Sequence, residues 1–134
     1  MTGGAGYIGS HAAKALRQAG YRVVIYDNLS AGHREAALGA PLVEGDIRDV
    51  DAVRRALKDS GASAVMHFAA WLTVSDSVHD PVGYYRNNVM GTLATLEDTT
   101  AGGTLATGGL SGWTSWRIVG EFGSRPGTSR ARVA

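Results

Sequence analysis

The chain has 134 residues, a net charge of +1 and 44% hydrophobic residues, which is typical of one soluble domain with a buried core. It contains no cysteine, so disulfides and thiolate metal sites are excluded. No apolar run approaches the ~20 residues that span a bilayer, and no signal-peptide pattern is present. The near-neutral charge gives no electrostatic reason to bind nucleic acid or a membrane. We therefore expect a cytoplasmic protein without nucleic-acid, membrane or metal partners.

Residues up to Glu97 alternate between helix-type and strand-type patterns. In chain order, the expected elements are a helix from residue 8 to about 19, a strand at 21–26, a short helical stretch at 34–38, a strand at 41–46, a helix closed by Gly61, a strand at 64–69, and a helix from Asp80–Pro81 to about 97. Either Asp49 or Asp51 fits the N-cap of the helix before Gly61. This alternation predicts an α/β protein with a parallel sheet covered by helices.

The pattern changes near Glu97. Residues 98–134 are rich in glycine, and all of their basic residues are arginines. They show no helix or strand periodicity apart from a weak strand pattern at 116–119. One interpretation is a flexible C-terminal tail. The other is a translated frameshift, favoured by Trp113 and Trp116, since tryptophan is unusual in disordered tails. We predict a partial dinucleotide-binding domain at 1–97 and an irregular, possibly frameshifted tail at 98–134.

The most informative motif is Gly3-x-x-Gly6-x-x-Gly9, followed by the first predicted helix. In such a motif the glycines permit a tight turn, a close approach of the backbone to a pyrophosphate, and close packing of helix on sheet. Asp27 ends the next predicted strand, eighteen residues after Gly9, near the ~20-residue offset at which an acid binds a ribose hydroxyl. An acid there favours NAD over NADP; the alternative is a simple turn residue.

The sequence also resembles a known family in several short blocks that occur in the right order. These are Thr2–His11, Asp27–Ser30, Gly45–Asp49, His67–Ala70 and Asp80–Pro81 with the following Tyr84–Val89 and Gly91–Leu93. They are similar to the opening of the UDP-glucose 4-epimerases, in the NAD-dependent epimerase/dehydratase family of the extended short-chain dehydrogenase/reductase superfamily. The resemblance covers residues 2–97, about the first third of a typical member. It implies a Rossmann-like doubly wound parallel sheet, here incomplete, with its first strand and its later strands missing.

The resemblance implies a set of NAD-binding residues. The expected set is Gly3, Gly6, Tyr7, Ile8 and Gly9 at the pyrophosphate, Asp27, Asn28 and Ser30 at the adenosine ribose, Asp46 and Ile47 at the adenine, Phe68, Ala69 and Ala70 beneath the cofactor, and Asn87 at its nicotinamide end. Each has a structural alternative: Ile47 and Phe68 fit a core, Asp46 fits a turn at a strand end, and Asn87 fits a helix-backbone contact. His67 and His11 are interpreted as structural residues.

Two departures from the family pattern bear on activity. Family members usually have a lysine that reaches the nicotinamide ribose of the cofactor. In this chain the best-aligned position is Leu72, which carries no charge. The family also oxidises and re-reduces the sugar 4-hydroxyl with a tyrosine base in Tyr-x-x-x-Lys, and no such motif occurs in the 134 residues. We therefore assign no catalytic residue and expect an NAD-binding fragment without epimerase activity, with a UDP-sugar substrate only in a full-length relative. The alternatives are another nucleotide-sugar epimerase or dehydratase, and a non-catalytic dinucleotide-binding protein. Homodimerisation through helices that include 80–97 is a family expectation.

The glycine motif begins at the first residues, where a preceding strand is expected. The first strand of a doubly wound sheet pairs with a neighbour on each side. Its absence predicts a gap of about twice the ~4.8 Å strand spacing, unpaired strand edges and weakened cofactor binding. Met1 stands where the family usually has valine, so we expect a reading frame that extends upstream.

Overall fold

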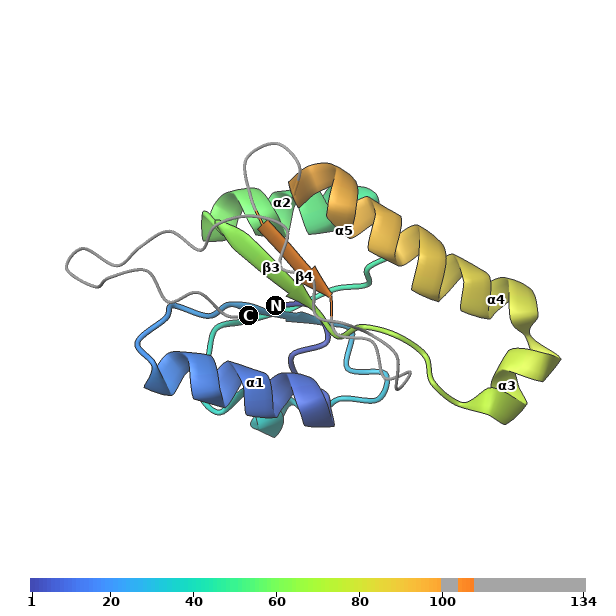
Figure 1. Cartoon of the computed structure of the whole chain (residues 1–134), viewed down its shortest axis with the longest axis horizontal. Helices are drawn as coiled ribbons and strands as arrows, with labels where there is room; N and C mark the ends of the chain where they lie inside the picture. Colours follow the sequence, from blue (N-terminus) through green and yellow to red (C-terminus); the bar gives the residue numbers. More distant parts are fainter. Residues whose placement is uncertain (100–103, 108–134) are drawn as a thin grey trace, which may run out of the picture.

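A parallel sheet lies between helices on its two faces in the computed structural model, which describes residues 1–99 and 104–107, and side chains to residue 95. Figure 1 shows α1 on one face of the strands and α2 with α5 on the other. The elements are α1 (Tyr7–Gln18), β1 (Ile25–Asp27), the 3₁₀ helix η1 (Arg34–Ala37), β2 (Leu42–Glu44), α2 (Val50–Ser60), β3 (Ala64–His67), α3 (Val74–His79), α4 (Pro81–Tyr85), the π-helix η2 (Arg86–Met90), α5 (Gly91–Thr99) and β4 (Thr104–Thr107). This confirms the predicted Rossmann-like alternation.

The strands form two parallel pairs joined by the first residues of the chain. β1 pairs with β2, and β3 pairs with β4. Thr2 makes parallel bridges to Tyr26 of β1 and to His67 of β3 at once. The spatial order is therefore β2, β1, Thr2, β3, β4.

Helix ends follow the chemistry of the sequence. Asp49 caps α2, since its Oδ1 accepts a hydrogen bond of 3.0 Å from the Ala52 amide, and this decides between the two predicted caps. Gly61 ends α2 in the left-handed conformation, at φ 60°. Asp80 caps α4 through the Gly83 amide at 2.9 Å, with Pro81 in the first turn.

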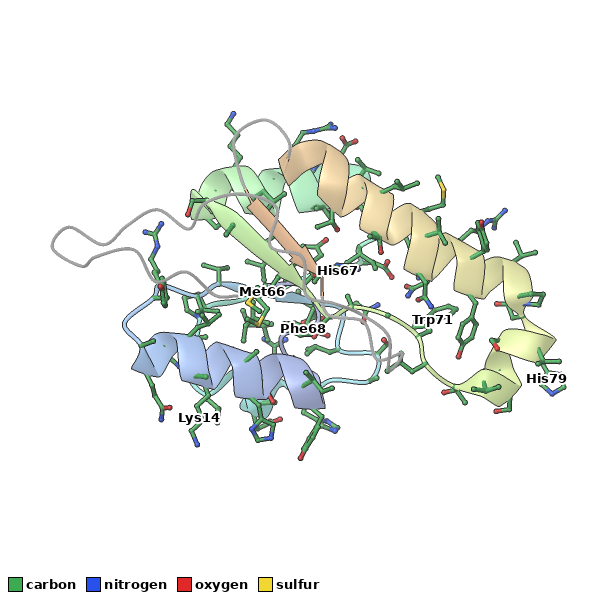
Figure 2. All side chains as sticks on the ribbon, viewed as in Figure 1. Lys14, Met66, His67, Phe68, Trp71 and His79 are labelled. Atoms are coloured by element: carbon green, nitrogen blue, oxygen red, sulfur yellow. The ribbon has the colours of Figure 1, made fainter. Side chains whose placement is uncertain are left out.

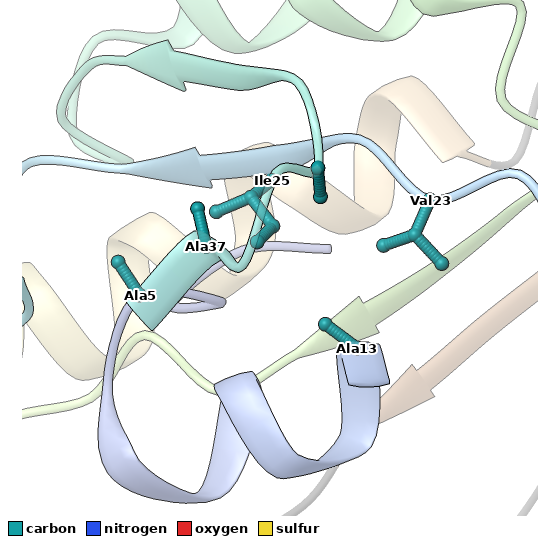
Figure 3. Packing of buried hydrophobic residues seen from close by; sticks show 6 residues of the cluster. Ala5, Ala13, Val23, Ile25 and Ala37 are labelled. Carbon is teal, nitrogen blue, oxygen red and sulfur yellow. The ribbon is translucent and has the colours of Figure 1, made fainter. Parts of the chain in front are cut away.

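The core lies in two clusters, one on each face of the sheet. The α1-side cluster contains Ala5, Ala13, Val23, Ile25, Ala37 and Ala40 (Figure 3). The α2-side cluster contains Tyr26, Ile47 and Val53. Small alanines dominate the first cluster, so α1 approaches the strands closely and the glycine segment stays against Ile25.

The expected gap at the first strand is only partly correct. Thr2 donates its amide to the Met66 carbonyl at 3.0 Å and accepts from the Phe68 amide at 2.9 Å, while Met1 accepts from the Tyr26 amide at 2.8 Å. The carboxyl end of the sheet, next to the glycine motif, is therefore continuous through Met1 and Thr2. The gap is confined to the opposite end of the strands.

Several element boundaries differ from the sequence prediction. β1 covers only the end of the predicted strand at 21–26, because residues 21–24 border the gap. The predicted helix from Pro81 is interrupted by η2, and α3 was not predicted because six residues are too few for a periodic pattern. The end of α5 and β4 fall beyond the predicted boundary at 97. The weak strand pattern at 116–119 lies outside the described residues.

Within the described part of the chain, no helix is long and apolar enough to cross a bilayer.

Candidate functional site

The glycine segment between Thr2 and α1 adopts a turn that side chains would disrupt. Gly3 has φ +68°, and an added Cβ would lie 2.5 Å from the Phe68 carbonyl carbon and the Ala69 amide nitrogen. A Cβ on Gly9 would lie 2.2 Å from the Gly3 carbonyl oxygen. A Cβ on Gly6 would meet only that same oxygen, at 3.4 Å. Gly3 and Gly9 thus hold the turn together, while Gly6 leaves its outer side open.

The open side of this turn is the N-terminus of α1. Gly6 provides no side-chain cap, and the first turn holds no acidic residue. The Ser10 amide is the first to bond back into the helix, to Gly6 at 2.9 Å. The amides of Tyr7, Ile8 and Gly9 have no acceptor within the part of the chain that the structure describes. Free amides and the positive end of the helix dipole together suit an anion such as a diphosphate.

A cavity of about 310 Å³ opens in front of this helix start, and we call it the glycine-loop cavity. It is lined by Gly3, Gly6, Tyr7, Ile8, Gly9, Tyr26, Asp27, Asn28, Ser30, Ala31, Gly32, Gly45, Ile47, Phe68, Ala69, Ala70, Trp71, Leu72 and Asn87. Every residue of the predicted cofactor set is among them except Asp46. The structure therefore brings together residues that lie more than eighty positions apart in the sequence.

Asp27 lies at the end of β1, where it is buried and each of its carboxylate oxygens accepts one hydrogen bond. One carboxylate oxygen accepts from the Ala5 amide and the other from the Leu29 amide, both at 2.9 Å. The same carboxylate thus fixes the glycine segment against the β1 loop. Asn28 follows, and its Oδ1 accepts from the Ser30 amide at 3.0 Å and the Ser30 hydroxyl at 2.7 Å. This local network gives the loop a defined shape at the cavity wall.

Asp46 lies behind the cavity wall and contacts other wall residues. Its carboxylate accepts from Arg48 Nε at 2.9 Å and Arg48 Nη2 at 2.7 Å, and from Asn28 Nδ2 at 3.2 Å. The hydrogen bonds from Arg48 hold the pKa of Asp46 well below its usual range. The Arg48 guanidinium also lies 5.7 Å from the centre of the Trp71 ring, in cation–π range. Asp46 thus links the walls from β1, β2 and β3.

The segment that leaves β3 forms the far wall, and Figure 2 shows Phe68 and Trp71 along it. The Asn88 side chain holds this segment by accepting from the Trp71 amide at 2.9 Å and donating to its carbonyl at 3.0 Å. Asn87 is buried beside it and donates to Asn88 Oδ1 at 2.9 Å. Both asparagines lie in the π-helical turn η2, and such turns are frequent at functional sites.

His67 lies just behind this wall and connects three elements. Its Nδ1 is 2.7 Å from the Thr2 hydroxyl oxygen and its Nε2 is 3.1 Å from that of Thr92 (Figure 2 labels His67). Burial, together with the nearby N-terminal ammonium, lowers the pKa of His67 to about 4. A neutral imidazole therefore joins the first residues, β3 and α5, which agrees with the structural role predicted for it.

Some cavity residues were not singled out from the sequence. The need for glycine at positions 32 and 45 is visible only in the folded structure. A Cβ on Gly32 would lie 2.8 Å from the Ala5 carbonyl, and a Cβ on Gly45 would lie 2.3 Å from the Tyr26 hydroxyl. Tyr26 and Ala31 contribute apolar surface, and Trp71 packs edge-on against Tyr84 with ring centres 5.2 Å apart. Leu72, where a lysine is expected, is 57% exposed at the rim. Among the described residues no group of His, Asp or Glu could hold a metal ion.

Comparison with known proteins gives consistent results. The profile of the NAD dependent epimerase/dehydratase family matches residues 1–104. A UDP-glucose 4-epimerase of Rhizobium leguminosarum bv. trifolii is 48% identical over 103 residues, and one of Azospirillum brasilense is 52% identical over 97 residues. These alignments cover 77% and 72% of this chain but only 32% and 28% of the relatives.

Solved structures match over the same region. The UDP-glucose 4-epimerase of Brucella ovis in complex with NAD is 48% identical, with a TM-score of 0.71 over 75% of this chain and 31% of that protein. The Thermus thermophilus enzyme in complex with NAD is 40% identical, with a TM-score of 0.72 over 75% of this chain and 32% of that protein. The chain thus spans about a third of the length of the relatives that it matches.

Proposed function

Because this chain belongs to the NAD dependent epimerase/dehydratase family, we propose that its first 97 residues are the NAD-binding region of a UDP-glucose 4-epimerase homologue. The observation that carries the proposal is the glycine-loop cavity. The uncapped start of α1, the acidic side chain of Asp27 and the segment that leaves β3 meet there. The bound NAD in the Brucella ovis and Thermus thermophilus structures supports it.

The residues of the cavity fit each part of a dinucleotide. The free amides of Tyr7 and Ile8 would bind the diphosphate, and Gly6 leaves room for its approach. Asp27, Asn28 and Ser30 would hold the adenosine ribose. Ile47 would contact the adenine. Asp46, which is not among the lining residues, would support the adenine side through its hydrogen bond with Asn28. Phe68, Ala69 and Ala70 would lie beneath the cofactor, with Asn87 near the nicotinamide. When bound, NAD supplies a hydride acceptor for a sugar hydroxyl.

We further propose that these 134 residues bind NAD without catalysing epimerisation. The chain contains no Tyr-x-x-x-Lys, so no tuned general base for the sugar hydroxyl can be assigned. The UDP-sugar would then be a substrate only of a protein with the remaining two thirds of the relatives' length. The absence of Tyr-x-x-x-Lys from these 134 residues also favours a second candidate, a non-catalytic dinucleotide-binding protein. Within the family, the alternative is an epimerase or dehydratase that acts on another nucleotide sugar. Residues 98–134 stand in this proposal as the segment that follows the 97-residue region, although α5 extends to Thr99 and Thr104–Thr107 pair with β3.

Calorimetric titration with NAD tests the binding proposal, with the variant Ile8→Glu compared with Ile8→Gln. Ile8 is 39% exposed in the first turn of α1 and lines the cavity. A glutamate there interacts favourably with the helix dipole, so the fold is retained. Its charge faces the proposed diphosphate site, so we expect NAD affinity to fall about tenfold or more, roughly 1.4 kcal/mol. The glutamine variant matches it in size without the charge and should bind within about threefold of the parent chain.

Equal affinities of the two Ile8 variants would contradict diphosphate binding at the start of α1. The second part of the proposal is tested by incubating the NAD-loaded chain with UDP-galactose and following UDP-glucose by chromatography. We expect no conversion. Turnover in proportion to the chain concentration would contradict the absence of a catalytic base.

A further inference from the structure

Arg48 lies outside the glycine-loop cavity and contacts residues of two of its walls. It belongs to the segment between β2 and α2, and its side chain is 47% exposed. On one side, its guanidinium donates to both carboxylate oxygens of Asp46, at 2.9 Å and 2.7 Å. On the other side, it lies 5.7 Å from the centre of the Trp71 ring. Arg48 is not among the lining residues, so its effect on a ligand passes through these two neighbours.

Asp46 connects Arg48 to the adenosine side of the cavity. Its carboxylate accepts from Asn28 Nδ2 at 3.2 Å, and Asn28 lines the cavity and orders Ser30 through its Oδ1. A two-point contact between arginine and a carboxylate has a defined geometry, whereas an ordinary exposed ion pair has little. The position of the guanidinium is therefore tied to the segments that follow β1 and β2.

Trp71, labelled in Figure 2, connects Arg48 to the opposite wall of the cavity. Asn88 holds its backbone at both the amide and the carbonyl. The Trp71 ring packs edge-on against Tyr84, whose hydroxyl donates to the Thr73 carbonyl at 2.8 Å. Trp71 therefore has a fixed backbone, one aromatic neighbour and one cationic neighbour, and it lines the cavity from this position.

The same two walls also meet through apolar contacts. Ile47 packs against Gly91 at the start of α5, where an added Cβ would lie 2.5 Å from Ile47 Cδ1, and Ala69 packs against the cluster that contains Ile47. Apolar contacts of this kind are not directional, so they hold the walls together without fixing how they are oriented. The contacts of Arg48 add directional hydrogen bonds on one side and a ring face on the other.

We propose that Arg48 is a positioning residue: by holding Asp46 and Trp71 at once, it sets the spacing between the adenosine side of the glycine-loop cavity and the β3 side, and so favours a ligand that spans both. This inference rests on the proposed function, since a dinucleotide is the ligand that would reach both sides. A wall that is already in place adds no ordering cost when a ligand binds. NAD benefits from this at both walls, whereas a ligand confined to the adenosine side benefits at one.

The variant Arg48→Met tests this, because it removes the guanidinium and keeps an unbranched apolar side chain. The full chain is titrated by calorimetry with NAD and with ADP, which carries the adenosine and the diphosphate but no nicotinamide riboside. We expect the variant to weaken NAD binding about three- to fivefold more than ADP binding, the size expected for an exposed cation–π contact. A loss of stability alone would lower the folded fraction equally for both ligands and leave the ratio of the two affinities unchanged.

The possible outcomes separate this inference from the proposed function. Equal weakening of NAD and ADP would confine the effect of Arg48 to Asp46 and overturn the inference, while NAD binding itself would stand. Absence of NAD binding to the parent chain would overturn the proposed function and this inference with it.

Arg34→Met is the matched control. It removes another exposed arginine–carboxylate pair, with Glu44 of β2, and neither of these residues lines the glycine-loop cavity. Its ratio of NAD to ADP affinity should stay within about twofold of the parent ratio. Arg48→Lys is a second variant that keeps the charge beside Asp46 but loses the two-point contact and the flat face. It should shift the ratio in the same direction as Arg48→Met, and an unchanged ratio would overturn the inference even where Arg48→Met does not fold.

A double-mutant cycle tests whether Arg48 acts through Trp71. NAD affinity is measured for Arg48→Met, for Trp71→Leu and for the double variant. Because the contact between the two side chains can be lost only once, the loss in the double variant should be at least about twofold smaller than the product of the two single losses. A loss equal to that product would show that the residues act independently and would overturn the inference.

Discussion

Two cavities lie at opposite ends of the same parallel strands and differ in the groups that they present. The glycine-loop cavity lies where the strands end and exposes the amides of a helix start together with polar side chains such as Asn28. The second cavity lies where the strands begin, bordered by residues 20–24 and 61–66 and by apolar side chains of α1 and α2. Helix amides converge on a point and suit an anion. Among the described residues that border it, the second cavity has no such convergent set of amides. Thr2 is common to both regions, since it lines the second cavity and leads into the glycine turn.

The largest expected effect on stability is the protonation of His67, whose imidazole contacts the Thr2 hydroxyl. Because its pKa is lowered from 6.5 to about 4, the unfolded chain binds the proton more tightly between these pH values. His67 therefore destabilises the fold as the pH falls from 6.5 to 4, by about 3 kcal/mol at 1.36 kcal/mol per pKa unit. Urea unfolding of the parent chain and of His67→Gln at pH 7 and pH 4 should show this loss in the parent alone. An identical pH dependence in both would contradict the role of the imidazole.

A smaller effect separates the two functions of the glycine turn. Gly9→Ala forces a Cβ to within 2.2 Å of the Gly3 carbonyl, so we expect the free energy of unfolding to fall by about 2 kcal/mol. Gly6→Ala meets no such obstacle and should cost less than about 1 kcal/mol. The Gly6 side faces the proposed diphosphate, so this variant should lose NAD affinity while remaining folded. Denaturant unfolding and NAD calorimetry of both variants check this; similar stabilities for the two would show that the turn can relax.

The smallest effect concerns the start of α2. Asp49→Ala removes the cap of α2 and should destabilise the chain by about 1 kcal/mol. Asp51→Ala removes an exposed ion pair with Arg54 at 3.0 Å and a first-turn acid but leaves the cap in place, so it should cost about 0.5 kcal/mol. Thermal unfolding should rank Asp49→Ala below Asp51→Ala, with unchanged NAD binding in both. The reverse order would place the helix start at the other aspartate.

Much of the glycine-loop cavity could be predicted because its signals are local. The spacing of Gly3, Gly6 and Gly9 and the position of Asp27 at a strand end reflect turn geometry that neighbouring residues set by themselves. The clamp from Asn88 to Trp71 and the need for glycine at Gly32 could not be predicted, because they depend on contacts between segments far apart in the chain. The helix interruption at η2 likewise left no periodic signal in the sequence.

The sequence by itself determined the alternation of helices and strands, the family resemblance and the glycine turn. Short-range sterics fix the turn, hydrophobic periodicity fixes the alternation, and short local motifs carry the resemblance. Only the tertiary structure decided that Thr2 closes the sheet beside the glycine turn, because its pairing depends on hydrogen bonds with two segments that lie far from it in the sequence. Backbone pairing between distant segments is cooperative, and no local pattern reports where it stops.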